Sequence, residues 1–172
     1  MVELKPQDYT KNKQLYLKTE ETLRAHLDKD TPISHVGSTA VPNIVGKNII
    51  DILVGAQNGE QFAKYSILLE EIGYFGSLKS KTEIYQFFAS KESETGDGDV
   101  HIHLAVVGTD RYEDFITLRD YLLDNPQEAA AYSEHKKLLV GSGITNRQEY
   151  RKIKSEYVSA LLNRARQNKK SK

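Results

Sequence analysis

Two short segments near the start of the chain combine residue types that suit a phosphate site. Gly37 and Ser38 end a short apolar segment, where glycine lets a ligand oxygen approach the backbone closely and the serine hydroxyl can donate a hydrogen bond. Asp51 follows Ser38 by thirteen residues, inside a β-branched run, and a carboxylate there can hold Mg²⁺ beside a substrate phosphate. If the two strands are neighbours, these three residues lie together, although glycine and serine at a strand end also form a common turn.

Four basic residues are natural phosphate binders in this pattern. Lys47 lies in the loop after Ser38, and Arg119, Lys136 and Lys154 fall in predicted helices. Lys136 and Lys154 each follow a tyrosine by four residues, so each pair lies on one helix face, either for base stacking or for simple helix packing. Arg119 could equally form a salt bridge with the adjacent Asp120.

Histidines and acidic residues around the last predicted strand have two interpretations. His101 and His103 are two apart, so both point to the same face of a strand, where such a pair more often forms structural hydrogen bonds than a metal site. Asp97 and Asp99 could add carboxylates, but their polar surroundings favour solvated charges. His35 could orient the glycine loop by hydrogen bonding or take part in chemistry.

The elements that must position these residues form a mixed α+β pattern. Apolar periodicity, caps and breakers predict helices at 8–27, 58–72, 112–123 and 127–140, a last helix opened by a capping box at 145–148, and strands at 33–36, 48–54, 84–88 and 100–107. The segment 91–98 is predicted to be a hairpin loop. We therefore expect a mixed β-sheet packed with helices and a helical C-terminal third.

Composition bounds the class of protein. The 172 residues suit one domain over 1–172, with a sheet-bearing core at about 1–110 and helices at about 111–168. The absence of cysteine excludes disulfides and thiolate metal sites, and no apolar run suits a signal peptide or a membrane span. A cytoplasmic location without a membrane partner is the expectation.

Charge is balanced overall but segregated along the chain. The 24 basic and 24 acidic residues cancel, yet residues 147–172 contain nine basic and two acidic side chains and carry a net charge of +7. We expect a basic terminal helix to lie against an acidic sheet-bearing body and to leave positive charge at the cleft for a phosphate. No interleaving of aromatic and basic residues typical of an RNA-binding module is present, so nucleic acid is a disfavoured partner.

Several segments match one family pattern in register over about residues 6 to 165. They are His35-Val36-Gly37-Ser38-Thr39-Ala40-Val41-Pro42, Lys47, Ile49-Ile50-Asp51-Ile52, His101-Ile102-His103-Leu104, Leu118-Arg119-Asp120-Tyr121-Leu122, Tyr132 with Lys136, and Tyr150 with Lys154-Ser155. Together they resemble the GrpB family, a branch of the nucleotidyltransferase superfamily. The family usually has glycine in place of Asn43 and proline in place of Asn48, so the loop here is expected to differ locally, and asparagine tolerates left-handed φ at some cost.

The resemblance implies a nucleotidyltransferase-like fold that binds a nucleotide or another phosphate-bearing small molecule, with nucleotidyl transfer as the implied reaction. The resemblance implies that Asp51 holds the metal ion. His103, which lies at the centre of its motif, would help to place the metal or the substrate, and Ser38 would be a further catalytic residue. The implied phosphate-binding residues are Gly37, Ser38, Thr39, Lys47, Arg119, Lys136 and Lys154.

One part of the superfamily's metal site is missing here. The superfamily pairs the first carboxylate with a second one two residues later and with a third on a later strand, but this chain has Leu53 and His103 there. A single carboxylate favours one Mg²⁺ ion, with Mn²⁺ or Zn²⁺ as weaker alternatives if His103 joins the coordination. The alternative is a non-catalytic binding or regulatory module for a nucleotide or a coenzyme-A-related ligand, which agrees with the fusion of some family members to dephospho-coenzyme A kinase.

Overall fold

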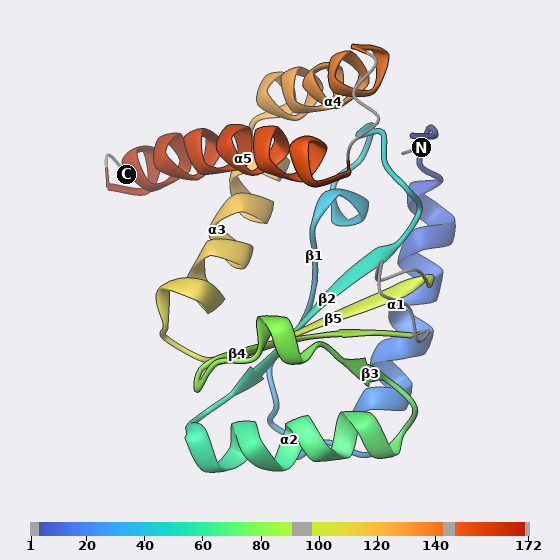
Figure 1. Ribbon diagram of the computed structural model, residues 1–172, viewed down its shortest axis with the longest axis vertical. Helices are drawn as coiled ribbons and strands as arrows, with labels where there is room; N and C mark the ends of the chain where they lie inside the picture. The colour runs from blue at the N-terminus through green and yellow to red at the C-terminus, as the bar shows by residue number, and fades with distance from the viewer. Residues whose placement is uncertain (1–3, 91–97, 143–146, 171–172) are drawn as a thin grey trace.

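A five-stranded mixed sheet forms the centre of the computed structural model, which describes residues 4–90, 98–142 and 147–170 (Figure 1). The strand order is β1-β2-β5-β4-β3, with β2 and β5 parallel and the other neighbours antiparallel. The strands are β1 (Ile33–Val36), β2 (Ile50–Ala56), β3 (Phe75–Gly76), β4 (Tyr85–Ala89) and β5 (Val100–Val106). The helices are α1 (Tyr9–Arg24), α2 (Gly59–Glu71), α3 (Asp110–Asp124), α4 (Pro126–Gly141) and α5 (Arg147–Lys170), with 3₁₀ turns η1 (Ser38–Ala40) and η2 (Leu78–Ser80).

The two faces of the sheet bury different sets of side chains because residues alternate along each strand. On one face, Ile52 of β2 and Ile102 of β5 pack with Leu23, Phe62 and other residues of α1 and α2 in the largest apolar cluster. On the other face, a smaller cluster of residues from β1, β2 and β5 packs against α3; its buried members are Val36, Leu53 and Ala105. The second face also carries Asp51, so it is the face that positions the site.

A third apolar cluster joins the C-terminal helices to the loop between β1 and β2. Val41 and Ile44 of that loop pack against Leu122 of α3, Tyr132 of α4 and the fully buried Leu161 of α5. The loop that follows Gly37 and the helical layer are therefore fixed to each other, and α4 and α5 lie at the opposite end of the molecule from α2 (Figure 1).

Local signals explain most element boundaries. Asn58 caps α2, since its side chain accepts a hydrogen bond from the backbone N–H of Gln61 (2.9 Å), and Gly73, with φ of 99°, follows its end. Pro126 begins α4, where its missing N–H costs nothing. The predicted α+β architecture is confirmed, and the predicted strands and helices all occur within a few residues of their expected bounds.

The structure adds the short strand β3, which the sequence analysis did not predict. The predicted hairpin loop falls largely on residues 91–97, and the first two residues of the capping box, 145–146, also lie outside the described residues. Asn43 and Asn48 adopt φ of 63° and 56°, the left-handed conformation that asparagine tolerates. Proline cannot adopt φ of 56°, so a proline in place of Asn48 would need a different backbone there. Across the described ranges, no helix has the length and apolarity that a membrane crossing requires.

Candidate functional site

The pairing of β1 with β2 places the loop that begins at Gly37 next to Asp51. Val36 pairs with Asp51 in the antiparallel register, so Gly37 lies beside the carboxylate at the end of β1. A Cβ atom at Gly37 would stand 2.3 Å from Asp51 Oδ2, and the backbone has φ of 71° and ψ of −170°, a region open mainly to glycine. Both constraints demand glycine at position 37, and the neighbouring strands that the sequence analysis required are confirmed.

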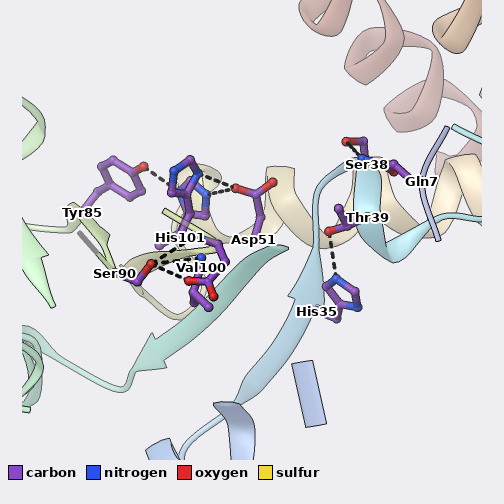
Figure 2. A network of polar contacts seen from close by, with 11 residues as sticks. Gln7, His35, Ser38, Thr39, Asp51, Tyr85, Ser90, Val100 and His101 are labelled. Carbon is purple, nitrogen blue, oxygen red and sulfur yellow. Dashed lines mark hydrogen bonds and ion pairs between the residues drawn. The ribbon is translucent and has the colours of Figure 1, made fainter. Parts of the chain in front are cut away.

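Asp51 is held by two histidines from the neighbouring strand β5. His101 Nδ1 lies 3.3 Å and His103 Nε2 lies 3.1 Å from the same carboxylate oxygen, Oδ1. The other ring nitrogen of His103, Nδ1, lies 2.8 Å from the hydroxyl of Tyr85 on β4. A neutral His103 with its proton on Nε2 can therefore donate to Asp51 and accept from Tyr85. Figure 2 shows Tyr85, His101 and Asp51 in this network.

The electrostatics of this network favour an ionised carboxylate and a neutral imidazole. Burial alone would raise the pKa of Asp51, but the hydrogen bonds from His101 and His103 outweigh burial and hold that pKa well below its usual value. Burial lowers the pKa of His103, although the adjacent Asp51 opposes the shift. About a quarter of the Asp51 side chain (25%) remains accessible, so a ligand can reach it.

A large cleft opens in front of Asp51, with a volume of about 1190 Å³. Its lining includes Ser38, Asp51 and His101 from the loop and the sheet, and Tyr150 from α5. Five basic residues also line it. Lys79 lies in η2, and we call the other four the cationic wall: Lys47, Lys136, Arg151 and Lys154. One cleft thus joins the Ser38 hydroxyl, the Asp51 carboxylate and the cationic wall, of which Lys47, Lys136 and Lys154 were expected from the sequence.

Lys136 is the most unusual member of the cationic wall because it is only 3% exposed. Its Nζ donates to the backbone oxygen of Val45 (2.5 Å) and lies 4.6 Å from the centre of the Tyr132 ring. Burial, assisted by the charge of Lys154, lowers the pKa of Lys136 to about 7, although Asp51 opposes the shift. Lys136 is therefore only partly charged near neutral pH.

Three of the expected phosphate-binding residues are not part of the cleft lining: Gly37, which lies against Asp51, and Thr39 and Arg119. Thr39 is buried, and its hydroxyl lies 3.0 Å from His35 Nε2, a contact that orients the loop (Figure 2). Arg119 contacts Asp120 (2.7 Å) and donates to the backbone oxygen of His35 (3.3 Å), in a separate hollow beside Tyr16. The salt bridge considered for Arg119 is therefore present.

The carboxylates considered near His101 do not add to the site. Asp99 pairs with the hydroxyl of Ser90 (2.9 Å), and Asp97 falls outside the described residues. Leu53, where the superfamily has a second carboxylate, is fully buried against α3. In the part of the chain that the structure describes, no three histidine or acidic side chains form a group able to hold a metal ion.

Three residues of the site were not among the catalytic, metal-binding or phosphate-binding residues expected from the sequence. His101 contacts Asp51 as His103 does, and its signal was the two-residue spacing that places both on one face. Tyr85 and Arg151 carried no local signal, because their positions depend on the pairing of β4 with β5 and on the docking of α5.

Comparisons with known proteins agree on one family. A family model described as GrpB protein matches residues 1–164. A UPF0157 protein of Pseudomonas aeruginosa is 34% identical over 133 residues, which are 77% of this chain and 54% of that protein. A UPF0157 protein of Vibrio cholerae is 33% identical over 151 residues, which are 88% of this chain and 76% of that protein. The chain thus spans about half the length of the first relative.

Solved structures show the same fold. The crystal structure of the conserved protein GrpB from Enterococcus faecalis superposes with a TM-score of 0.74 at 22% identity and covers 96% of both chains. Cid1, a poly(U) polymerase, in complex with its short product ApU has a TM-score of 0.52 at 16% identity, over 80% of this chain and 41% of Cid1. The fold is therefore nucleotidyltransferase-like.

Proposed function

The chain belongs to the GrpB family, and from that premise we propose that it binds a nucleotide or another phosphate-bearing small molecule in the cleft in front of Asp51. One observation carries the proposal: Ser38 and Asp51 share a single cleft with the cationic wall. Five basic residues and two acidic ones, Glu70 and Asp51, line this cleft, and that excess of basic residues favours an anionic ligand.

Each element contributes a different contact to the bound phosphate. Gly37 lets the Asp51 carboxylate lie directly against the backbone before η1, and Ser38 supplies a hydroxyl to the cleft. Lys47 and Lys154 supply ammonium groups from the loop and from α5, while Lys136 takes up a proton as the phosphate binds, because an adjacent anion raises the pKa of a buried lysine.

A single Mg²⁺ ion fits this arrangement better than two. Asp51 offers one carboxylate, whose Oδ1 is occupied by the two histidines and whose Oδ2 faces Gly37. Mg²⁺ accepts one protein carboxylate together with substrate phosphates and water. A two-metal site would need the second carboxylate that this chain lacks. Mn²⁺ and Zn²⁺ would need His103 to give up its hydrogen bond to Asp51.

The buried Leu53 favours a second candidate, a binding or regulatory module without turnover. Both candidates share the phosphate site, and they differ in whether Asp51 and a metal ion matter. Nucleotidyl transfer releases pyrophosphate as an acceptor oxygen bonds to the α-phosphorus, so pyrophosphate release from ATP measures the chemical step.

Calorimetric titration with ATP, dephospho-coenzyme A and inorganic tripolyphosphate tests the binding site. Lys154→Met should weaken every ligand that binds by about tenfold or more, the effect of losing one charged hydrogen bond. Lys64→Met is the matched control, because Lys64 pairs with Asp28 and does not line the cleft. Binding that is absent at millimolar concentration for all three ligands, or equal losses in both variants, would refute the proposal.

The same titrations with and without Mg²⁺ separate the two candidates. A gain in ATP affinity with Mg²⁺ that is lost in Asp51→Asn, together with pyrophosphate release, supports the transferase. Binding that is indifferent to Mg²⁺ and to Asp51→Asn supports the module.

A further inference from the structure

One row of side chains crosses the sheet from the candidate carboxylate to the far edge. The strand registers align Asp51 of β2 with His101 of β5, His101 with Ala89 of β4, and Ala89 with Phe75 of β3. Residues directly opposite each other on neighbouring strands point to the same face of a sheet. All four residues line the cleft, so the row forms its floor.

The spacing of this row suits an extended ligand. Neighbouring strands lie about 4.8 Å apart, so the backbone of Phe75 lies about 14 Å from that of Asp51. Ala89 lies between His101 and Phe75 in this row, and its small side chain leaves space between the two rings. A ligand that contacts Asp51 at one end can therefore reach Phe75 at the other.

The two sides of the cleft differ in chemistry. The lining also contains four apolar or aromatic residues from β3, β4 and the segments beside β3, and we call them the apolar wall: Tyr74, Phe75, Leu78 and Phe87. Phe75 is 45% exposed and Leu78 is 79% exposed. Glu70 and Lys79 are the charged residues on this side, of opposite sign. Exposed apolar side chains that share a cavity with convergent polar groups are typical of a ligand site.

We propose that Phe75 and Leu78 form a nucleoside subsite, in which the planar base of a nucleoside 5′-phosphate lies against the Phe75 ring while its phosphates lie along the cationic wall. This inference rests on the proposed function and adds the part of the ligand that the phosphate site leaves undefined. A bare polyphosphate would leave the apolar wall in water, whereas an aromatic ring favours stacking with a planar base. Free nucleotides and coenzyme-A-type molecules share this nucleoside phosphate chemistry.

The test compares a ligand that has a base with one that lacks it. Full-length protein is titrated with ATP and with inorganic tripolyphosphate, and dephospho-coenzyme A is added to distinguish the two sources of nucleoside phosphate. We expect wild-type protein to bind ATP more tightly than tripolyphosphate. We expect Phe75→Ala to weaken ATP binding about 5- to 100-fold, the range for loss of one stacked base, and to leave tripolyphosphate binding unchanged.

Two further variants guard against an effect on folding. Phe75→Leu keeps an apolar side chain at the edge strand and removes only the ring, so it should retain the wild-type circular dichroism spectrum and still lose affinity for ATP. Leu138→Ala removes a leucine that is 71% exposed on α4 but does not line the cleft, so both affinities should stay at the wild-type values.

The outcomes separate this inference from the proposed function. Tripolyphosphate binding as tight as ATP binding, or an equal loss of both in Phe75→Leu, would overturn the nucleoside subsite and leave the phosphate site standing. Failure of both ligands to bind the wild-type protein would overturn both proposals.

Discussion

Gly37 touches the carboxylate that the site depends on, with no room for even one carbon atom between them. An alanine Cβ would lie 2.3 Å from Asp51 Oδ2 and would hold the backbone at φ of 71°. We expect Gly37→Ala to lower the free energy of unfolding by about 1–3 kcal/mol, from backbone strain and from the displaced carboxylate. Urea denaturation measures this loss, and the variant should also lose affinity for phosphate ligands.

Gly59→Ala serves as the control for that substitution. Gly59 begins α2, and a Cβ there would meet no atom within 4 Å. Alanine is at least as stable as glycine in a helix, so this variant should match or exceed the wild-type stability. An equal loss in both variants would contradict the role given to the contact with Asp51.

Lys136 makes the stability of the protein depend on pH. Its pKa is about 7 in the folded protein and near 10.5 in an unfolded chain, so between these values the unfolded chain holds a proton that the folded protein has released. The free energy of unfolding should therefore rise with pH across this window, by at most about 1.4 kcal/mol per pH unit. Phosphate binding should weaken over the same range, because the ligand favours the protonated amine.

Lys136→Met isolates this contribution. Methionine fills a similar space and does not titrate, so urea denaturation of the variant at pH 6, 7.5 and 9 should lack the rise that the wild type shows above pH 7. Parallel pH profiles for the two proteins would show that another group is responsible.

At the level of residues, the sequence predicts those parts of the site that depend on short-range geometry. Gly37, Ser38 and Asp51 could be placed together because each lies on or next to a strand whose apolar run is clear. Thr39 and Arg119 could not be placed, since rotation of a 3₁₀ turn or a helix about its axis decides whether a side chain faces a ligand or a neighbour. That rotation is set by tertiary packing.

The attachment of α5 decides whether the cationic wall exists, because α5 carries Arg151 and Lys154. Leu161 is fully buried among residues of α3, α4 and the loop after η1. We expect Leu161→Ala to lower the free energy of unfolding by about 2–5 kcal/mol, through lost burial and the resulting cavity. Thermal or urea unfolding measures the loss.

A matched truncation defines the outcome for Leu161. Leu138→Ala removes the same side chain from a largely exposed position and should change stability by less than about 0.5 kcal/mol. A similar small effect in Leu161→Ala would mean that α5 is not held by this cluster.

Helices and strands could be predicted wherever the pattern of apolar residues was long enough to show a helical or strand period. The strands β2 and β5 and the helices α1 to α4 have apolar runs or stripes that define them. The strand β3 has two residues, Phe75 and Gly76, which is too short for any alternation, and it exists because its backbone pairs with β4. For that reason the far wall of the cleft was not foreseeable from the sequence.

The basic residues of α5 fall into two groups, one in ion pairs with other helices and one in the lining of the cleft. The last part of α5 pairs with acidic residues of the helical layer, Arg164 with Glu128 (3.0 Å) and Arg166 with Asp114. The sequence predicted a basic helix against an acidic sheet-bearing body, whereas these two pairs join α5 to the helices α3 and α4. In the first part of α5, Arg151 and Lys154 line the cleft.

Salt should therefore affect the two properties unequally. Exposed ion pairs contribute about 0–1 kcal/mol each, so raising NaCl from low to high concentration should change the melting temperature little. Attraction between a polyphosphate and several cations is screened over about 10 Å at 0.1 M salt, so tripolyphosphate affinity should fall strongly. A melting temperature that falls in step with affinity would contradict this division.

The central position of β5 has a kinetic consequence. Asp51 and Gly37 belong to the β1–β2 pair, which is local in the chain, but both histidines stand on β5, which must enter between β2 and β4. Non-local pairing of this kind is slow because a long loop must close first. During refolding, the helical circular dichroism signal should therefore return before the capacity to bind ligand. Stopped-flow measurement of both signals would show when β5 pairs with its neighbours.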